Sequence, residues 1–284
     1  MAKFDMSRAW NDAVAMVKSN REVLMVVAGV FFLLPTLVLT LLFADEQAQA
    51  MATMQQMMTS GTAGTSPTAG PATGFFIASA VAGIVQLVGF MTLLALFDDN
   101  VRPTVAEAGA TALRSLPTLI GAVLLFVIGY LVMGLVFGLI AGGLGAALGA
   151  GWLVAILMVP FIVGVFYVMT KLSLTLAVII LERQTNPMAA LKRSWALTKG
   201  NSVMLFTFYM LLVIVYLVIS ILISGVLMGL VMLALGSGPI GLIVVGVVSG
   251  LVGAAANVIF TGVIASVHRQ LAGASPGGLG DTFS

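Results

Sequence analysis

Six long apolar runs constrain this chain more than any other feature of its sequence. A helix that crosses a membrane needs about 20 consecutive, mainly apolar residues. With 61% hydrophobic and 8% charged residues, the 284-residue chain also has too little polar surface to cover a water-soluble domain. The sequence therefore predicts an all-α, polytopic integral membrane protein that forms a single membrane domain over residues 1–284. The expected spans lie near residues 23–43, 75–97, 117–141, 152–181, 203–235 and 239–267.

The twelve Lys and Arg residues all fall on one side of the membrane when these runs are read as spans. Short cytoplasmic loops retain cationic residues, so this asymmetry predicts cytoplasmic N and C termini in a bacterial-type inner membrane. The bases are Lys3, Arg8, Lys18, Arg21, Arg102, Arg114, Lys171, Arg183, Lys192, Arg193, Lys199 and Arg269.

The charge balance also bears on partners. The net charge is only +2, and two acidic residues, Asp45 and Glu46, fall on the predicted outer side. The positive excess on the inner side predicts attraction to anionic lipid headgroups, and we expect no nucleic-acid partner. The absence of Cys excludes disulfides, thiolate catalysis and cysteine-ligated metals.

The first apolar run has an alternative interpretation as a signal peptide. Ala48-Gln49-Ala50 resembles a small-residue cleavage site after an apolar segment. The run is long for a signal peptide, however, and an organised amphipathic segment precedes it. We therefore expect an uncleaved first span.

A short amphipathic cytoplasmic helix is predicted before each odd-numbered span, which gives three helical hairpins with one interfacial helix apiece. In the first helix, Met6 and Trp10 begin an apolar stripe at helical spacing, as expected for a helix lying in the interface. The second begins with Thr104 and Glu107, which have the spacing of a capping box. It is expected to end before Pro117, which suits the first turn of a new span.

The third interfacial helix carries the clearest start and stop signals. Asn186 is a good N-cap, Pro187 fits the first helical position, and Gly200 suits the position after the helix. The residues that join each interfacial helix to its span are similar, which indicates three copies of one unit. These junctions are Val17-Lys18-Ser19-Asn20, Leu113-Arg114-Ser115-Leu116 and Thr198-Lys199-Gly200-Asn201.

The outer connections are predicted to be short, except for residues 44–74. This segment is rich in Thr, Gly, Pro and Ala, which cannot bury a core, so we expect disorder. Its methionines could hold Cu(I) through their thioethers or could simply form one helical face. We favour the helical face and expect no cofactor. The four are Met51, Met54, Met57 and Met58.

Lys171 is the only base deep inside an apolar run. Ionisable groups in spans often mark functional pathways, but a Lys can also extend to the interface as an anchor. Both interpretations stay open, with the interfacial anchor favoured over a pocket or headgroup contact. Glu182 is too distant along the helix to pair with Lys171, so Arg183, Lys192 or Arg193 is the expected partner.

The other polar residues in the spans predict packing rather than chemistry. Gln86 and Asn257 are expected to hydrogen-bond between helices. His268, the only His, is expected to be a cationic interfacial cap beside Arg269. Without a second His, a Cys or grouped carboxylates, no hydrolase or metal constellation can be assembled, and we expect no catalytic residues.

Two stripes of small residues predict close helix contacts. One consists of Gly134, Gly138 and Gly142, and the other includes Gly246 and Gly250. Small residues let helices approach closely within lipid. Packing within the chain is the favoured interpretation, and a homodimer through Gly134, Gly138 and Gly142 is the alternative.

The segment from Lys171 to Gly200 resembles a known group of membrane proteins. Lys171-Leu172-Ser173-Leu174, Glu182 and the run Ala190-Leu191-Lys192-Arg193-Ser194-Trp195-Ala196-Leu197-Thr198-Lys199-Gly200 carry the resemblance. They are similar to the YciC-like proteins and to the membrane domain attached to some bacterial glycerophosphoryl diester phosphodiesterases. The resemblance implies a six-span fold but no activity, because the soluble phosphodiesterase domain is absent.

The sequence thus predicts a non-enzymatic inner-membrane protein. Its expected role is lipid-related organisation of the envelope or service as the membrane subunit of a partner, with transport of a small molecule or lipid as the alternative. A polar cavity reaching Lys171, Gln86 or Asn257 would favour transport. The residues expected to contact headgroups or a partner are Lys171, Glu182, Lys192, Arg193, Ser194, Trp195 and Lys199.

Overall fold

The computed structural model is all-α over the residues it describes, namely 3–46, 73–98, 101–149, 151–235 and 239–273. Six helical segments in these ranges are long and apolar enough to cross a membrane, which confirms the predicted class. Residues 47–72 lie outside the described residues. The predictions of a disordered outer loop and of a methionine face within it therefore stay predictions. The six segments are Arg21–Leu42, Thr73–Leu96, Val105–Ala147, Ile156–Leu181, Ser202–Val231 and Ile243–Ala272.

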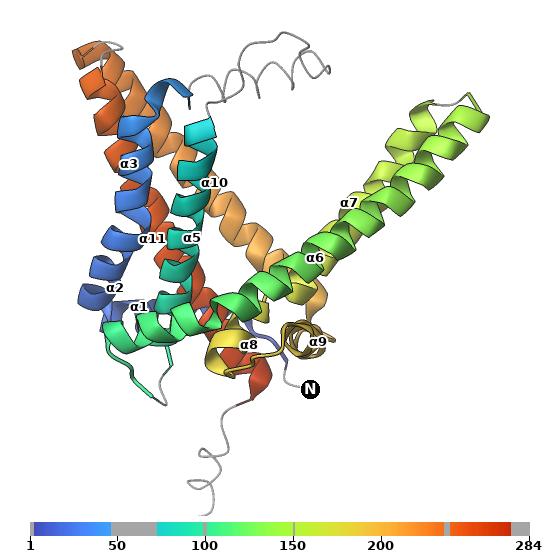
Figure 1. The fold of residues 1–284 in the computed structure, drawn as a ribbon, viewed down its shortest axis with the longest axis horizontal. Helices are drawn as coiled ribbons and strands as arrows, with labels where there is room; N and C mark the ends of the chain where they lie inside the picture. The colour runs from blue at the N-terminus through green and yellow to red at the C-terminus, as the bar shows by residue number, and fades with distance from the viewer. Residues whose placement is uncertain (1–2, 47–72, 99–100, 150, 236–238, 274–284) are drawn as a thin grey trace, which may run out of the picture.

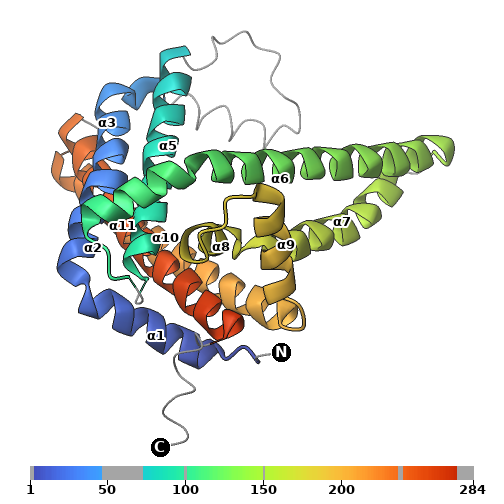
Figure 2. The same ribbon diagram turned by 60° about the horizontal axis from the view of Figure 1, so that its bottom comes forward.

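Helix α1 (Met6–Ser19) lies before the first span and packs along α11 (Pro239–Ala272), the last helix (Figures 1 and 2). The Asp5 carboxylate caps it by accepting a hydrogen bond from the Arg8 amide. The first span then combines α2 (Arg21–Ala28), a π-helical turn η1 (Gly29–Leu33) and α3 (Leu34–Leu42). Pro35 is the second residue of α3, and because it has no N–H, the regular ladder of hydrogen bonds cannot continue through it.

The structure of the third span differs from the prediction of a separate helix before Pro117. Helix α6 (Val105–Ala147) runs through Pro117 without interruption, so residues 105–116 do not form a separate helix. The predicted capping box at its start is confirmed, with Thr104 and Glu107 each bonding the main chain of the other. Figure 1 shows the helix changing direction along its first half, as expected for an internal proline. Gly121, just beyond Pro117, allows the bent helix to lie directly against Pro187.

The fourth span is also different from its prediction. Residues 152–181 are not one helix, because α7 (Gly151–Leu172) ends and α8 (Thr175–Leu181) begins after a two-residue turn. The Ser173 hydroxyl donates to the Thr170 carbonyl at 2.8 Å, and the Thr175 hydroxyl donates to the Leu172 carbonyl at 2.7 Å. Side chains thereby satisfy carbonyls that have lost their helical partners, so the helix can end in apolar surroundings.

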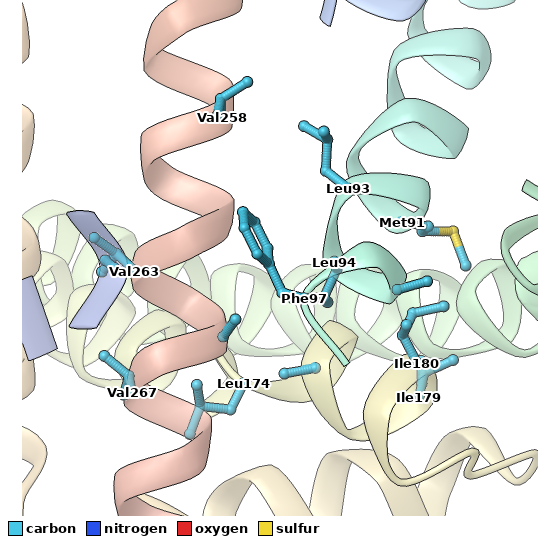
Figure 3. Close-up of a cluster of buried hydrophobic side chains, with 14 of the residues drawn as sticks. Met91, Leu93, Leu94, Phe97, Leu174, Ile179, Ile180, Val258, Val263 and Val267 are labelled. Carbon is cyan, nitrogen blue, oxygen red and sulfur yellow. The ribbon is translucent and has the colours of Figure 1, made fainter. Parts of the chain in front are cut away.

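The packed core lies at the end of the molecule where α8 is found. Figure 3 shows Phe97, which follows α5 (Thr73–Leu96), on one side of α11 and Val263 of α11 on the other side, with Leu174 of the α7–α8 turn below Phe97. All three are at most 1% exposed. In contrast, α6 and α7 extend together away from this core (Figure 1). The elements that carry most of the described basic residues, including α1, the start of α6, α9 (Pro187–Leu197) and the end of α11, gather at the core end.

The two glycine stripes behave differently. A Cβ at Gly246 would lie 2.8 Å from Thr40 Cγ2, and one at Gly250 would lie 2.9 Å from Leu33 Cδ1, so this stripe packs tightly against the first span. The favoured intramolecular packing of Gly134, Gly138 and Gly142 is wrong, because a Cβ at any of them would meet nothing within 4 Å. The alternative, a homodimer through these three glycines, stays a prediction.

Candidate functional site

The site is organised by α9, a short helix between α8 and the fifth span, α10 (Ser202–Leu235). The Asn186 carboxamide oxygen accepts hydrogen bonds from the Met188 and Ala189 amides at 3.0 and 3.2 Å. Pro187 occupies the first turn, and Gly200 adopts a φ of 85° after the helix. The predicted start and stop signals are therefore confirmed, and they fix both ends of α9.

Two hydroxyl groups of α9 hold the end of α7. Ser194 Oγ donates to the main-chain carbonyl of Lys171 at 2.9 Å, and Thr198 Oγ1 lies 3.3 Å from the same oxygen. Both residues are fully buried. Because they are four residues apart, they lie on the same face of α9. In this conformation Ser194 is a packing residue, so it does not form the surface contact expected from its sequence.

The side chain of Lys171 lies beside two aromatic rings. The residue is 2% exposed, so it is not an anchor that extends freely into solvent. Its Nζ lies 5.5 Å from the centre of the Tyr167 ring and 5.6 Å from that of the Trp195 ring. These two rings meet edge to face with centroids 6.0 Å apart. Aromatic faces attract cations at such distances, so Lys171 and Trp195 link α7 to α9 a second time.

Glu182 joins three elements. Its carboxylate accepts from Arg193 Nε at 2.9 and 3.2 Å, which confirms Arg193 as a partner, and its Oε1 lies 3.0 Å from His268 Nε2. His268 is 6% exposed, so the prediction of an interfacial cap was wrong. The pattern of the sequence could not indicate this contact, because 86 residues separate the two side chains. The contact between Glu182 and His268 therefore connects the segment between α8 and α9 to α11.

The remaining predicted residues, together with Met188, which was not predicted, form an exposed stripe. Met188, Lys192, Trp195 and Lys199 recur at helical spacing on the outer face of α9 and its C-terminal turn, and all four are exposed. Trp195 is 41% exposed, so its ring both covers Lys171 and reaches the surface. We call these four residues the α9 stripe.

The polar residues of the other spans do not join the site. Asn257 Nδ2 donates to the Gly253 carbonyl of its own helix at 2.9 Å, so the predicted bond between helices is absent for this amide. Gln86 is half-buried on α5. A pocket of about 230 Å³ lies between α6 and the α7–α9 region, and its lining includes Leu119, Phe126 and Met169. It is mainly apolar, and neither Lys171 nor either amide lines it.

The Ser and His side chains of this arrangement are already hydrogen-bonded within the protein. Ser194 Oγ is bonded to a main-chain carbonyl, and His268 Nε2 is bonded to Glu182. Nucleophilic catalysis requires a hydroxyl activated by a nearby base, and the bonds of Ser194 do not supply one. Among the described residues, no group of three or more His, Asp or Glu side chains could hold a metal ion.

The fold and site define a multi-pass α-helical membrane protein in which the short helix α9 is hydrogen-bonded to the end of α7 and to Glu182. Residues 146–270 match the family model described as the membrane domain of glycerophosphoryl diester phosphodiesterase. The match includes Lys171, Glu182 and the whole of α9, so it confirms the resemblance seen in the sequence. That description names a membrane domain and not a catalytic domain. No curated protein and no solved structure matches the chain.

Proposed function

We propose that this protein binds anionic lipid headgroups on the cytoplasmic face of a bacterial inner membrane through the α9 stripe. In this proposal it is not an enzyme, and it serves in the lipid-related organisation of the membrane or as the membrane subunit of a partner. The observation that carries the proposal is the alignment of Lys192, Trp195 and Lys199 on one exposed face.

The chemistry of the stripe suits a membrane surface. Lys192 and Lys199 place two positive charges on either side of Trp195, whose ring has the amphipathic character favoured at headgroup level. Each basic residue near an anionic surface contributes about 1 kcal/mol of attraction. Met188 extends the same face with an apolar side chain, which is 46% exposed.

The rigidity of α9 supports the same proposal. The helix is held by the Ser194 and Thr198 bonds to Lys171 and by the bond between Arg193 and Glu182. A helix that is ordered before binding loses less conformational entropy on contact with a ligand. Arg193 is better regarded as part of this support than of the headgroup contact.

The structure gives less support to transport. A polar cavity that reaches Lys171, Gln86 or Asn257 would favour transport. The pocket beside α7–α9 is lined mainly by apolar side chains, and none of the three residues contributes to it. We therefore keep headgroup binding as the single proposal.

Native mass spectrometry in a mild detergent tests it. We expect the protein to retain phosphatidylglycerol in preference to phosphatidylcholine, and Lys192→Ala/Lys199→Ala to weaken that retention at least about tenfold. The matched control is Lys18→Ala/Arg114→Ala, which removes two exposed positive charges from other helices. Equal retention by the stripe variant and the control would contradict the proposal.

A further inference from the structure

The ammonium group of Lys171 has no polar partner in the part of the chain that the structure describes. None of the described ion pairs or hydrogen bonds involves its Nζ. An ammonium group carries three N–H donors, and burying a charge without hydrogen bonds is costly. The two aromatic rings contribute about 0.5–2 kcal/mol of attraction but accept no conventional hydrogen bond. Lys171 is therefore a donor group, without a polar partner among the described residues, that can bind an anion.

The two aromatic residues beside Lys171 are themselves partly exposed. Tyr167 and Trp195 are 47% and 41% exposed, although the Lys between them is 2% exposed. Both rings therefore lie next to the ammonium group, and both residues reach the surface. The Tyr hydroxyl and the Trp indole N–H are two further donors on these residues.

Nothing acidic in the described residues competes for Lys171. Glu182, the acidic residue of the site, is already bonded to Arg193 and His268. The main chain at Lys171 is held by the hydrogen bond from Ser194 Oγ to its carbonyl oxygen, and Thr198 Oγ1 lies 3.3 Å from the same oxygen. A fixed cation without a carboxylate partner is preorganised for an external oxyanion.

We propose that Lys171, framed by Tyr167 and Trp195, is a binding site for a phosphate group. Phosphate has several acceptor oxygens for the three ammonium donors and the flanking hydroxyl and indole groups, and Lys is a common point-charge partner of phosphate. The α9 stripe, which includes Trp195, would concentrate anions beside these rings. This site rests on the proposed headgroup function and refines it, because it distinguishes phosphate-bearing ligands from other anions.

Trp195 fluorescence provides the test. Trp10→Phe/Trp152→Phe leaves Trp195 as the single Trp of the chain, which contains three. This protein is titrated in a phosphate-free maltoside detergent with inorganic phosphate, with dihexanoyl phosphatidic acid and with hexanoate. We expect a saturable change in emission with a phosphate-bearing ligand and none with hexanoate. Lys171→Met should weaken the response at least about tenfold, while Tyr167→Phe, which keeps the ring, should weaken it only a few-fold.

The titrations also identify the source of the phosphate. A response to both phosphate compounds assigns the site to phosphate itself, a response to phosphatidic acid alone assigns it to a lipid headgroup, and a response to inorganic phosphate alone assigns it to a soluble ligand. No saturable response, an equal response to hexanoate or an unchanged affinity in Lys171→Met would overturn the site. If Lys171→Met does not fold, the titrations of the protein with native Lys171 decide alone.

The two proposals fail separately. If the Trp195 titrations show no response but lipid retention still depends on Lys192 and Lys199, only the Lys171 site is wrong. If retention does not depend on the stripe but Trp195 responds to phosphate, the stripe proposal is wrong and the anion site remains.

Discussion

The hydroxyl of Ser194 donates a hydrogen bond of 2.9 Å to the main-chain carbonyl of Lys171. This bond explains why a Ser precedes Trp195 in the segment that carries the family resemblance. It satisfies a carbonyl at the end of α7, and it places Trp195 against the Lys171 side chain. A single residue thus connects the end of a membrane span to the exposed stripe of α9.

The Ser194 and Thr198 hydroxyls should stabilise the protein redundantly. Ser194→Ala alone should cost about 1 kcal/mol, because Thr198 still lies close enough to donate to the Lys171 carbonyl. Ser194→Ala/Thr198→Val leaves that buried carbonyl without either donor, so its cost should exceed the sum of the single changes by about 1–2 kcal/mol.

The free energy of unfolding in mixed micelles measures these changes. Thr207→Val is the matched control, because the Thr207 hydroxyl bonds only a carbonyl of its own helix at an exposed position. We expect it to change the stability by less than about 0.5 kcal/mol. Additive effects of the Ser194 and Thr198 changes would show that the two hydroxyls do not share one acceptor.

The connection through Glu182 should also contribute to stability. Glu182→Gln keeps the shape of the side chain but removes the negative charge that faces Arg193 and His268. We expect a loss of about 1–2 kcal/mol, since hydrogen bonds to charged groups are worth more than neutral ones.

Asp12→Asn is the control for charge removal. Asp12 pairs with Arg8 at 3.8 Å on the exposed face of α1, and exposed pairs contribute little. Thermal unfolding in nanodiscs should therefore show a clear decrease for Glu182→Gln and almost none for Asp12→Asn. A comparable decrease in both would mean that the bonds around Glu182 have no special role.

Local signals in the sequence predicted both ends of α9, whereas distant contacts could not be predicted. The bonds of Asn186 to Met188 and Ala189 lie within three residues, so residue type and spacing are sufficient to predict them. The contact between Glu182 and His268 depends on how α11 packs against α8, and no local pattern encodes it.

The prediction that a helix ends before Pro117 was wrong for a related reason. Proline often ends a helix, but one missing hydrogen bond can be tolerated when strong helix formers lie on both sides. Packing also favours the bend, since Gly121 lies against Pro187 after it. The sequence contains both residues but does not show that they meet.

Glycine substitutions should separate the two kinds of helix face. A Cβ at Gly89 would overlap Phe31 Cβ, which is close to the main chain and cannot rotate away. Gly89→Ala should therefore reduce the free energy of unfolding by about 1–3 kcal/mol, the usual cost of overpacking. Gly134→Ala is the matched control, because its Cβ would meet nothing within 4 Å. We expect it to be neutral or slightly stabilising, since Ala favours a helix. Equal losses for both variants would contradict the described packing.

The absence of Cys makes the membrane orientation directly testable, because each introduced thiol is the only one in the chain. Leu148 is 66% exposed at the turn between α6 and α7, and Lys192 is exposed on α9 at the opposite end of the molecule (Figure 1). The distribution of basic residues predicts that Leu148 faces outward and Lys192 faces the cytoplasm. A membrane-impermeant maleimide added to intact spheroplasts should therefore label Leu148→Cys at once and Lys192→Cys only after lysis. Total labelling in detergent corrects for differences in expression. The reverse pattern would place the α9 stripe on the outer face, where the attraction to the anionic lipids of the cytoplasmic leaflet would not operate.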